Sequence, residues 1–102
     1  MKISTKSKIE FDWNDEKAIY NYNKHKVSFE EAMTVWDDEF AAFIHDSFHS
    51  EKEERFLLIG YSIKNNLLFV SFTERNDKIR LISSRKATKF ERKRHEESRN
   101  KY

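Results

Sequence analysis

The chain has 102 residues, of which 37% are hydrophobic, 37% are charged and 15% are aromatic. That length accommodates one domain, residues 1–102, with one modest core. The aromatic content argues against disorder, because buried rings offset the entropy cost of ordering. The absence of cysteine excludes disulfides, thiolate nucleophiles and cysteine-ligated zinc, and a single glycine excludes a glycine-rich phosphate loop.

No apolar run approaches the length that crosses a bilayer, and the charged first ten residues lack the apolar segment of a secretion signal. We therefore expect a cytoplasmic protein with no membrane partner. Flexible ends are expected at residues 1–8 and 99–102.

The net charge of +2 conceals an uneven distribution. Residues 1–74 carry 9 Lys and Arg against 14 Asp and Glu, whereas residues 75–102 carry 11 against 4. A basic end on a mildly acidic body is typical of a protein that binds a polyanion. A solvated basic helix would give the same count, so charge alone leaves both readings open.

The first elements are a short strand and a helix. Phe11-Asp12-Trp13 alternates as a strand does. Asn14 or Asp15 is a typical helix cap, and acidic residues follow it where the helix dipole favours them. The apolar stripe beyond the cap predicts a helix that ends near Lys24.

A second helix begins near Ser28. Ser28 and Glu31 have the spacing of a capping box. Apolar residues follow at i, i+3, i+4 and i+7, which is one face of a helix. That face contains Phe29, Ala32, Met33 and Trp36.

The apolar period then changes to that of strands, which are predicted over 40–45, 55–62, 67–75 and 78–85, with a polar loop at 46–54. Asn65-Asn66 and Asn76-Asp77 stand at hairpin positions. The last segment, 86–98, favours a basic helix with few apolar residues, which would lie loosely on the sheet or dock on a partner. The predicted fold is α+β, in the order β-α-α-β-β-β-β-α, with two N-terminal helices packed on an antiparallel sheet.

The turn at Asn76-Asp77, if it has two residues, fixes which side chains share a face. Arg75 then faces Lys78, and the pairing continues as far as Phe69 opposite Ser84. One face is apolar and should cover the core: Leu68, Val70, Phe72, Ile79 and Leu81. The other is basic and hydroxylated, with two apolar members: Phe69, Ser71, Thr73, Arg75, Lys78, Arg80, Ile82 and Ser84. Arg85 falls on the core side, at the end of its strand.

The basic face suits RNA, because guanidinium groups bind phosphate oxygens in pairs and an aromatic ring stacks on an unpaired base. The alternative is a solvent-exposed face whose cations pair with carboxylates such as Glu54 and Glu74.

No serine has a nucleophile-elbow context. The histidines lack the HExxH spacing, and His45 and His49 fall in a predicted strand and loop, so no metal site is expected.

Metal-independent RNA cleavage fits the residues that remain. In this reaction the 2′-hydroxyl attacks its own phosphodiester, and the protein takes one proton, gives another and neutralises charge on the phosphate. No cofactor is needed. Candidates for the proton transfers are His25, Glu54 and Glu74. Candidates for binding the phosphate are Arg55, Arg75, Arg80, Arg85 and Lys86.

Several short motifs in order along the chain resemble one known family. They are Phe11-Asp12-Trp13, KHKVSFEEA over Lys24–Ala32, Asp37-Asp38, a segment with Ser50, Glu53-Glu54-Arg55 and Gly60, FTER over Phe72–Arg75, and ISSRKAT over Ile82–Thr88. Together with their spacing, these resemble the BrnT family of bacterial type II toxins. The resemblance covers about residues 9–97.

The resemblance implies a RelE-like fold and a ribonuclease toxin that arrests growth. It also implies a BrnA-like antitoxin with a ribbon-helix-helix domain, and binding of operator DNA only through the toxin–antitoxin complex. The family's characteristic polar residues fall on Trp13, Lys24, His25, Ser28, Glu54, Arg55, Arg75, Arg85, Lys86 and Thr88. With the hairpin, this gives the catalytic candidates His25, Glu54, Arg55, Arg75, Arg80 and Arg85. The RNA-binding candidates are Lys24, Lys78, Lys86, Phe69, Ser71 and Thr73.

One position departs from the family pattern, which usually has Gly after the Lys-His pair, where a helix ends in a left-handed turn. Lys26 stands there, at a cost of about 1 kcal/mol if the turn is kept. The leading hypothesis is an antitoxin-neutralised ribonuclease. A non-catalytic module that binds RNA or a partner is the alternative, and a transcription factor is disfavoured because no helix-turn-helix pattern occurs.

Overall fold

The computed structural model describes residues 2–3, 8–49 and 52–99. Six strands form one sheet in the order β1-β2-β6-β5-β4-β3. The strands are β1 (Lys2–Ile3), β2 (Glu10–Asp12), β3 (Ala42–His45), β4 (Arg55–Tyr61), β5 (Leu67–Arg75) and β6 (Lys78–Lys86). The helices are α1 (Asp15–His25), α2 (Phe29–Met33) and α3 (Lys89–Arg99), with 3₁₀ turns η1 (Thr34–Asp37) and η2 (Ser47–His49). No helix in the described residues has the length and apolarity to cross a membrane.

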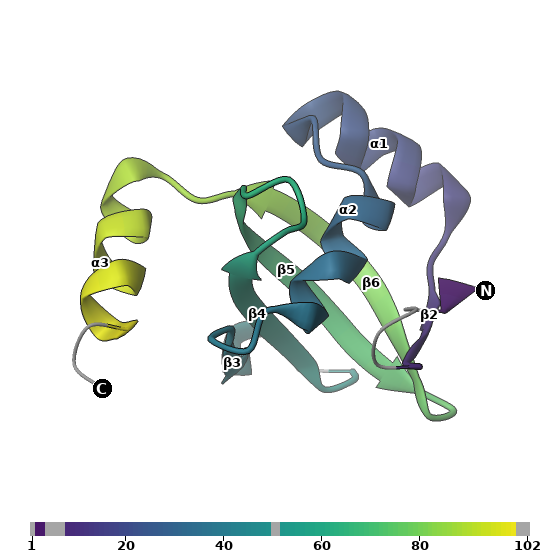
Figure 1. The fold of residues 1–102 in the computed structure, drawn as a ribbon. Helices are drawn as coiled ribbons and strands as arrows, with labels where there is room; N and C mark the ends of the chain where they lie inside the picture. The colour runs from purple at the N-terminus through teal and green to yellow at the C-terminus, as the bar shows by residue number, and fades with distance from the viewer. Residues whose placement is uncertain (1, 4–7, 50–51, 100–102) are drawn as a thin grey trace.

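The α+β class and the order of the predicted elements are confirmed, with β1 added before them. Figure 1 shows α1 and α2 on one side of the strands and α3 apart from them, after a connection that leaves β6. We call the side under α1 and α2 the helical face of the sheet and the opposite side the open face. Of the ends expected to be flexible, residues 1, 4–7 and 100–102 lie outside the described residues.

The prediction of an antiparallel sheet is wrong at one edge, because β2 pairs with β6 in parallel, with Phe11 opposite Ile79 and Asp12 opposite Arg80. Parallel neighbours require a long crossover between them. Here the chain passes through both N-terminal helices and three other strands before β6 returns beside β2. The short β2 segment gave no sign of its partner, so its direction could not be predicted.

The two N-terminal helices begin as predicted. The Asn14 side chain accepts a hydrogen bond from the Lys17 amide, and Ser28 Oγ accepts one from the Glu31 amide. The left-handed turn after α1 is kept in spite of its side chain, since Lys26 has φ 58° and its amide bonds the Tyr22 carbonyl. The turn for which the resemblance led us to expect glycine is therefore formed with lysine.

The predicted capping box is only half formed, because the Glu31 carboxylate turns away from Ser28. It is buried, and accepts hydrogen bonds from Ser62 Oγ at 2.6 Å and Asn66 Nδ2 at 2.9 Å. These two residues belong to the turn between β4 and β5, so Glu31 ties α2 to that turn. The helix itself ends at Met33 and continues as the 3₁₀ turn η1.

The core lies between the helical face and α1, α2 and η1. Trp36 contacts Phe11 and Phe72 edge-on, with ring centroids 5.0 and 4.9 Å apart. Gly60 is required by close packing here, because a Cβ would lie 2.9 Å from both Ala41 Cβ and Asp38 Oδ2. The largest fully buried apolar side chains are Phe11, Phe29, Phe72, Leu67, Leu68, Leu81, Val27, Val35 and Val70.

The predicted hairpin register holds for four pairs and then shifts. Arg75 faces Lys78 as predicted, and the agreement continues to Phe72 opposite Leu81. Ser71 then faces Ser83 rather than Ile82, so Ile82 is the extra residue of a β-bulge. Both turn residues, Asn76 and Asp77, have positive φ, as a two-residue hairpin turn requires.

The bulge exchanges the faces of the residues after it. Ser84 was predicted on the open face, but it is fully buried, and its amide and carbonyl are bonded by the Asn21 side chain at 3.0 and 2.9 Å. Arg85 was predicted on the core side, but it pairs with Phe69 on the open face. Because the buried Asn21 of α1 bonds Ser84 directly, the helix and the bulge fit together.

Candidate functional site

The candidate residues fall into two groups at opposite ends of the sheet. One group lies where β4 begins and β5 ends, and contains Glu54, Arg55, Thr73, Arg75, Lys78 and Arg80. The other lies where α1 and β6 end, and contains Lys24, His25, Arg85 and Lys86. These ends are far apart in Figure 1. The nine residues of β6 span roughly 26 Å at about 3.3 Å per residue, so the two groups do not form one catalytic site.

The first group is built by strand alternation. Thr73 and Arg80 are a cross-strand pair, as are Arg75 and Lys78, and Arg55 faces Thr73 from β4. All five side chains therefore belong to the open face. Thr73 is buried, and its hydroxyl donates to the Glu54 carbonyl, which fixes the segment that leads into β4.

The arginines of this group are paired with carboxylates that differ from those considered from the sequence. Arg75 donates from Nε and Nη2 to both oxygens of Glu53, at 3.0 and 3.1 Å. Arg80 donates to Asp12 at 3.0 Å. The Arg75 side chain is nonetheless 51% exposed. Exposed ion pairs contribute only about 0–1 kcal/mol, so a phosphate can compete for these guanidinium groups.

A cavity of about 540 Å³ opens beside this group. It is lined by Phe48, His49, Lys52, Glu53, Arg55 and Arg75. Three cations and an aromatic ring thus border one space. The sequence analysis identified Arg55 and Arg75 but missed Phe48, His49 and Lys52, because they lie in the segment interpreted only as a polar loop.

Two histidines in this region are paired with carboxylates. His45 Nε2 contacts the Glu54 carboxylate, and His49 Nδ1 lies 2.8 Å from Asp46 Oδ2. Glu54, a predicted proton-transfer group, is therefore engaged with His45, which does not line the cavity. The signal for the second pair was the Asp46–His49 spacing of three residues, which one turn of 3₁₀ helix brings together.

Arg85, in the second group, anchors α3. Its guanidinium donates to both oxygens of Glu91 at 2.8 and 3.0 Å and lies over the Phe69 ring, 4.5 Å from its centroid. Thr88 and Glu91 form a complete capping box at the start of α3. The hydrogen bonds from Arg85 and Thr88 lower the pKa of Glu91 to about 2, and the pairing raises the pKa of Arg85.

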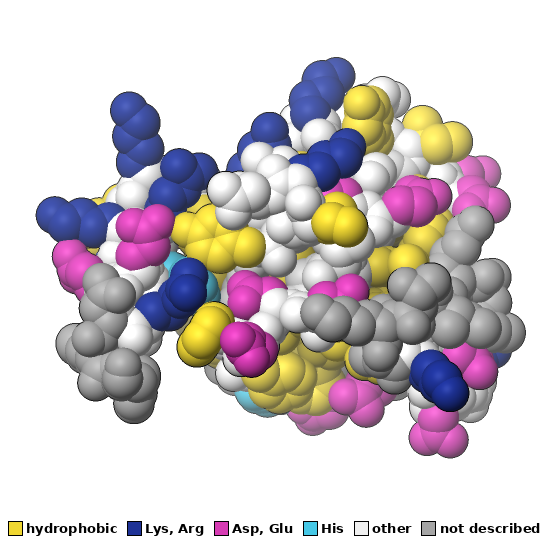
Figure 2. Space-filling view, viewed as in Figure 1, with side chains coloured by type: hydrophobic (Ala, Val, Ile, Leu, Met, Phe, Trp, Pro, Cys, Tyr) yellow, Lys and Arg dark blue, Asp and Glu magenta, His cyan; other side chains and the backbone are white. Residues whose placement is uncertain are grey.

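The rest of α3 touches the sheet lightly, and none of its residues, all of them described, is buried. Tyr61 donates to Glu96, and Arg99 lies over the Phe40 ring. Burial and the Glu96 contact raise the pKa of Tyr61, while burial lowers the pKa of His95. Lys and Arg side chains gather over α3 in Figure 2, which agrees with the predicted basic helix.

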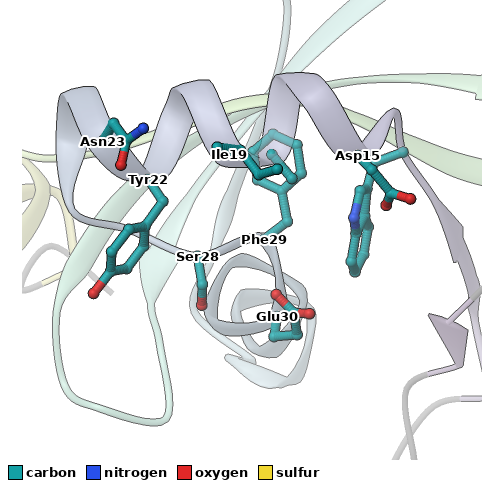
Figure 3. Close-up of a pocket in the computed structure, with 9 residues that line it drawn as sticks. Asp15, Ile19, Tyr22, Asn23, Ser28, Phe29 and Glu30 are labelled. Atoms are coloured by element: carbon teal, nitrogen blue, oxygen red, sulfur yellow. The ribbon is translucent and has the colours of Figure 1, made fainter.

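A second cavity, of about 550 Å³, lies between α1 and α2 (Figure 3). Its walls include Trp13, Ile19 and Phe29, and its acidic members are Asp15 and Glu30. No Lys, Arg or His lines it, so it does not suit a polyanion. Within the described residues, no group of three His, Asp or Glu is arranged to hold a metal ion.

Comparisons with known proteins agree with the fold. A model of the family described as "Ribonuclease toxin, BrnT, of type II toxin-antitoxin system" matches residues 13–91. The crystal structure of the Brucella abortus ribonuclease toxin BrnT superposes with a TM-score of 0.62 at 20% sequence identity, covering 79% of this chain and 99% of that one. At this identity the likeness concerns the fold alone. No curated protein matches the chain.

Proposed function

Since the chain belongs to the BrnT family of ribonuclease toxins of type II toxin–antitoxin systems, we propose that it cuts RNA in the cavity beside Arg55 and Arg75. It arrests growth until a cognate antitoxin binds it. The observation that carries this proposal is the meeting of two guanidinium groups and Lys52 around one open cavity. Their geometry suits a phosphate, which arginine binds through two parallel hydrogen bonds.

The reaction proposed is metal-independent transesterification within the RNA. The 2′-hydroxyl loses its proton, its oxygen forms a bond to phosphorus, and the bond to the 5′-oxygen breaks as that oxygen gains a proton. The products are a 2′,3′-cyclic phosphate and a new 5′-hydroxyl. Arg55 and Arg75 neutralise the charge that builds on the phosphate, and Arg80 and Lys78 extend the positive surface along β6.

The other predicted residues take supporting roles in this proposal. Arg85 positions α3 through Glu91 rather than touching the reacting phosphate. Lys24, His25 and Lys86 lie too far along the sheet for the cleavage step, and bind a distal part of the RNA. The Arg85 guanidinium covers part of the Phe69 ring, and Ser71 lies on β5 between the two ends. Thr73 is buried and holds the segment before β4 in place rather than contacting RNA.

The antitoxin proposed is a BrnA-like protein with a ribbon-helix-helix domain, and operator DNA is bound only through the complex. It should cover the cavity or the basic surface beside it, since either blocks access of RNA. We also propose a cytoplasmic location, where the RNA substrate is found, and a RelE-like relationship for the fold.

Expression of the chain alone in bacteria tests the function. Induction should stop growth with decay of RNA, and Arg75→Ala should relieve both, with a loss of cleavage rate of about 10²–10³-fold in purified protein. Arg92→Ala, an exposed arginine of α3 outside the cavity, is the matched control and should remain toxic. Cleavage should persist in EDTA; its loss there would contradict the metal-independent mechanism.

One observation favours the non-catalytic alternative: Arg75, Arg80 and Arg85 each pair with a carboxylate of the same chain. A binding module would keep such pairs as part of its surface. Growth arrest with intact RNA would support that function, whereas arrest with RNA decay that Arg75→Ala abolishes would support the ribonuclease.

A further inference from the structure

We propose that His49, held by Asp46, is the catalytic base of this toxin, and that Phe48 beside it stacks on an unpaired base of single-stranded RNA. This inference rests on the proposed ribonuclease function and adds the group that moves the proton. Neither residue was a candidate from the sequence.

Asp46 is held in place by a backbone hydrogen bond that does not involve the histidine. Its amide donates to the Arg55 carbonyl at 2.9 Å, at the start of β4, and its side chain is only 15% exposed. The His49 ring lies 2.8 Å from this carboxylate and is 65% exposed. The carboxylate is therefore anchored to the sheet, while the imidazole extends from it towards solvent.

The Asp46 contact also decides which ring nitrogen can react. An ionised carboxylate only accepts hydrogen bonds, so Nδ1 of His49 must carry a proton. In the neutral ring Nε2 is then the unprotonated nitrogen, which is the form of a general base. The hydrogen bond also keeps the ring from rotating, so Asp46 acts as a positioning residue.

His49 is the only one of the four histidines, all of them in described residues, that lines the cavity of Arg55 and Arg75. His45 is engaged by Glu54 and the Phe56 ring. His25 lies at the other end of the sheet, and His95 lies on α3 against Tyr61. The charged groups that face His49 are Asp46, Lys52, Glu53, Arg55 and Arg75.

The proton transfer balances with water as the only other participant. Nε2 of His49 takes the proton of the 2′-hydroxyl as the 2′-oxygen bonds to phosphorus and the 5′-oxygen leaves. The 5′-oxygen takes a proton from water, and His49 gives its own proton to the hydroxide that remains. Arg75 and Arg55 hold the phosphate between the two oxygens, so one cavity supplies both charge and base.

Phe48 gives the cavity a place for a nucleobase. The residue is 90% exposed, so the face of its ring is open to a ligand. A ring beside arginines is the arrangement that binds unpaired bases by stacking while cations bind the backbone. The substrate is therefore single-stranded, because a base inside a duplex does not offer its face.

The test is cleavage of a fluorescently labelled single-stranded RNA oligonucleotide by the purified toxin between pH 5 and pH 9. His49→Ala should lower kcat by about 10²–10⁴-fold, change the shape of the pH profile, and regain activity with added imidazole. Asp46→Asn should lower the rate less and also change that shape. His45→Ala, the other histidine with a carboxylate partner, should keep both rate and profile.

Phe48→Ala should raise KM about fivefold or more with little change in kcat, whereas Phe90→Ala, an exposed ring on α3, should change neither. If the wild-type toxin does not cut RNA, the proposed function fails and this inference with it. If the wild type cuts and His49→Ala is equally fast, the function stands and the assignment of His49 is wrong. Loss of activity in His45→Ala alone would assign the proton transfer to the Glu54 pair instead. Thermal melts of each variant show whether it is folded.

Discussion

The two faces of the sheet are held by different forces. On the helical face, buried rings and aliphatic side chains contact α1, α2 and η1, and the buried polar groups Asn21 and Glu31 bond to named partners. On the open face, the contacts are ion pairs and rings beneath cations, and α3 buries none of its residues. Packing of buried side chains stabilises the helical face, and ion pairs and cation–ring contacts order the side chains of the open face.

This difference separates stability from function. Substitutions on the helical face should unfold the protein, because they leave cavities or unpaired polar groups. Substitutions of the paired arginines should scarcely change stability, since exposed ion pairs contribute about 0–1 kcal/mol. A variant such as Arg75→Ala therefore loses activity while it keeps its fold, and the core variants below do the reverse.

The largest expected effect is on the helical face, at Phe72. This side chain is 1% exposed and contacts the rings of Trp36, Phe43 and Phe56. Phe72→Ala should lower the free energy of unfolding by about 3–5 kcal/mol, measured by urea denaturation. Phe90→Ala, on the exposed α3, should change it by less than about 0.5 kcal/mol. Equal effects of the two variants would remove the contrast between the faces.

The next effect is at Asn21, which joins α1 to the β6 bulge. Asn21→Ala leaves the Ser84 amide and the Ser84 and Val27 carbonyls without this partner, at an expected cost of about 2–3 kcal/mol. Asn23→Ala, exposed on the same helix, has the same change in helix propensity and should be neutral or slightly stabilising. A cost for Asn21→Ala no greater than for Asn23→Ala would mean that the bulge does not depend on this bond.

The same bulge marks where prediction from the sequence ended. The turn at Asn76-Asp77 has a local signal, and the register follows from it for four pairs. The extra residue Ile82 has no local signal. The bulge is held by hydrogen bonds between Ser84 and Asn21, and Asn21 lies about 60 positions earlier in the chain. A prediction from local pattern therefore placed Ser84 and Arg85 on the wrong faces.

The candidate site divides in the same way. Arg75 could be found because it lies at the end of a strand beside a recognisable turn, where alternation assigns the face. Arg55 was named for its charge and for the family resemblance, and its face was not predicted. His49 could not be found, because its position depends on a 3₁₀ turn and on a bond to Asp46 within an irregular segment. Local periodicity carries no information about such a segment, although the family resemblance spanned it.

The smallest effect concerns α3, whose docking should weaken in acid in two steps. Burial lowers the pKa of His95, so the docked helix favours the neutral ring. Docking is therefore unaffected above pH 6.5, the usual pKa of histidine, and weakens as the pH falls below that value. Glu91 has a pKa of about 2 when bonded to Arg85 and 4.5 otherwise, so its contribution is complete above 4.5 and is lost towards pH 2.

Amide hydrogen exchange of α3 measures both steps. The groups that face His95 are Tyr61, Asp38, Glu96 and Arg99, of which the two carboxylates favour the charged ring and Arg99 opposes it. Protection of the α3 amides, relative to their intrinsic exchange rate at each pH, should fall between pH 7 and pH 5 in the wild type and stay level over that range in His95→Phe. Protection of the β5 amides should stay level in both, because the helical face holds that strand independently of α3. If β5 opens together with α3 in the wild type, the two faces are one cooperative unit, and the separation of stability from function does not hold.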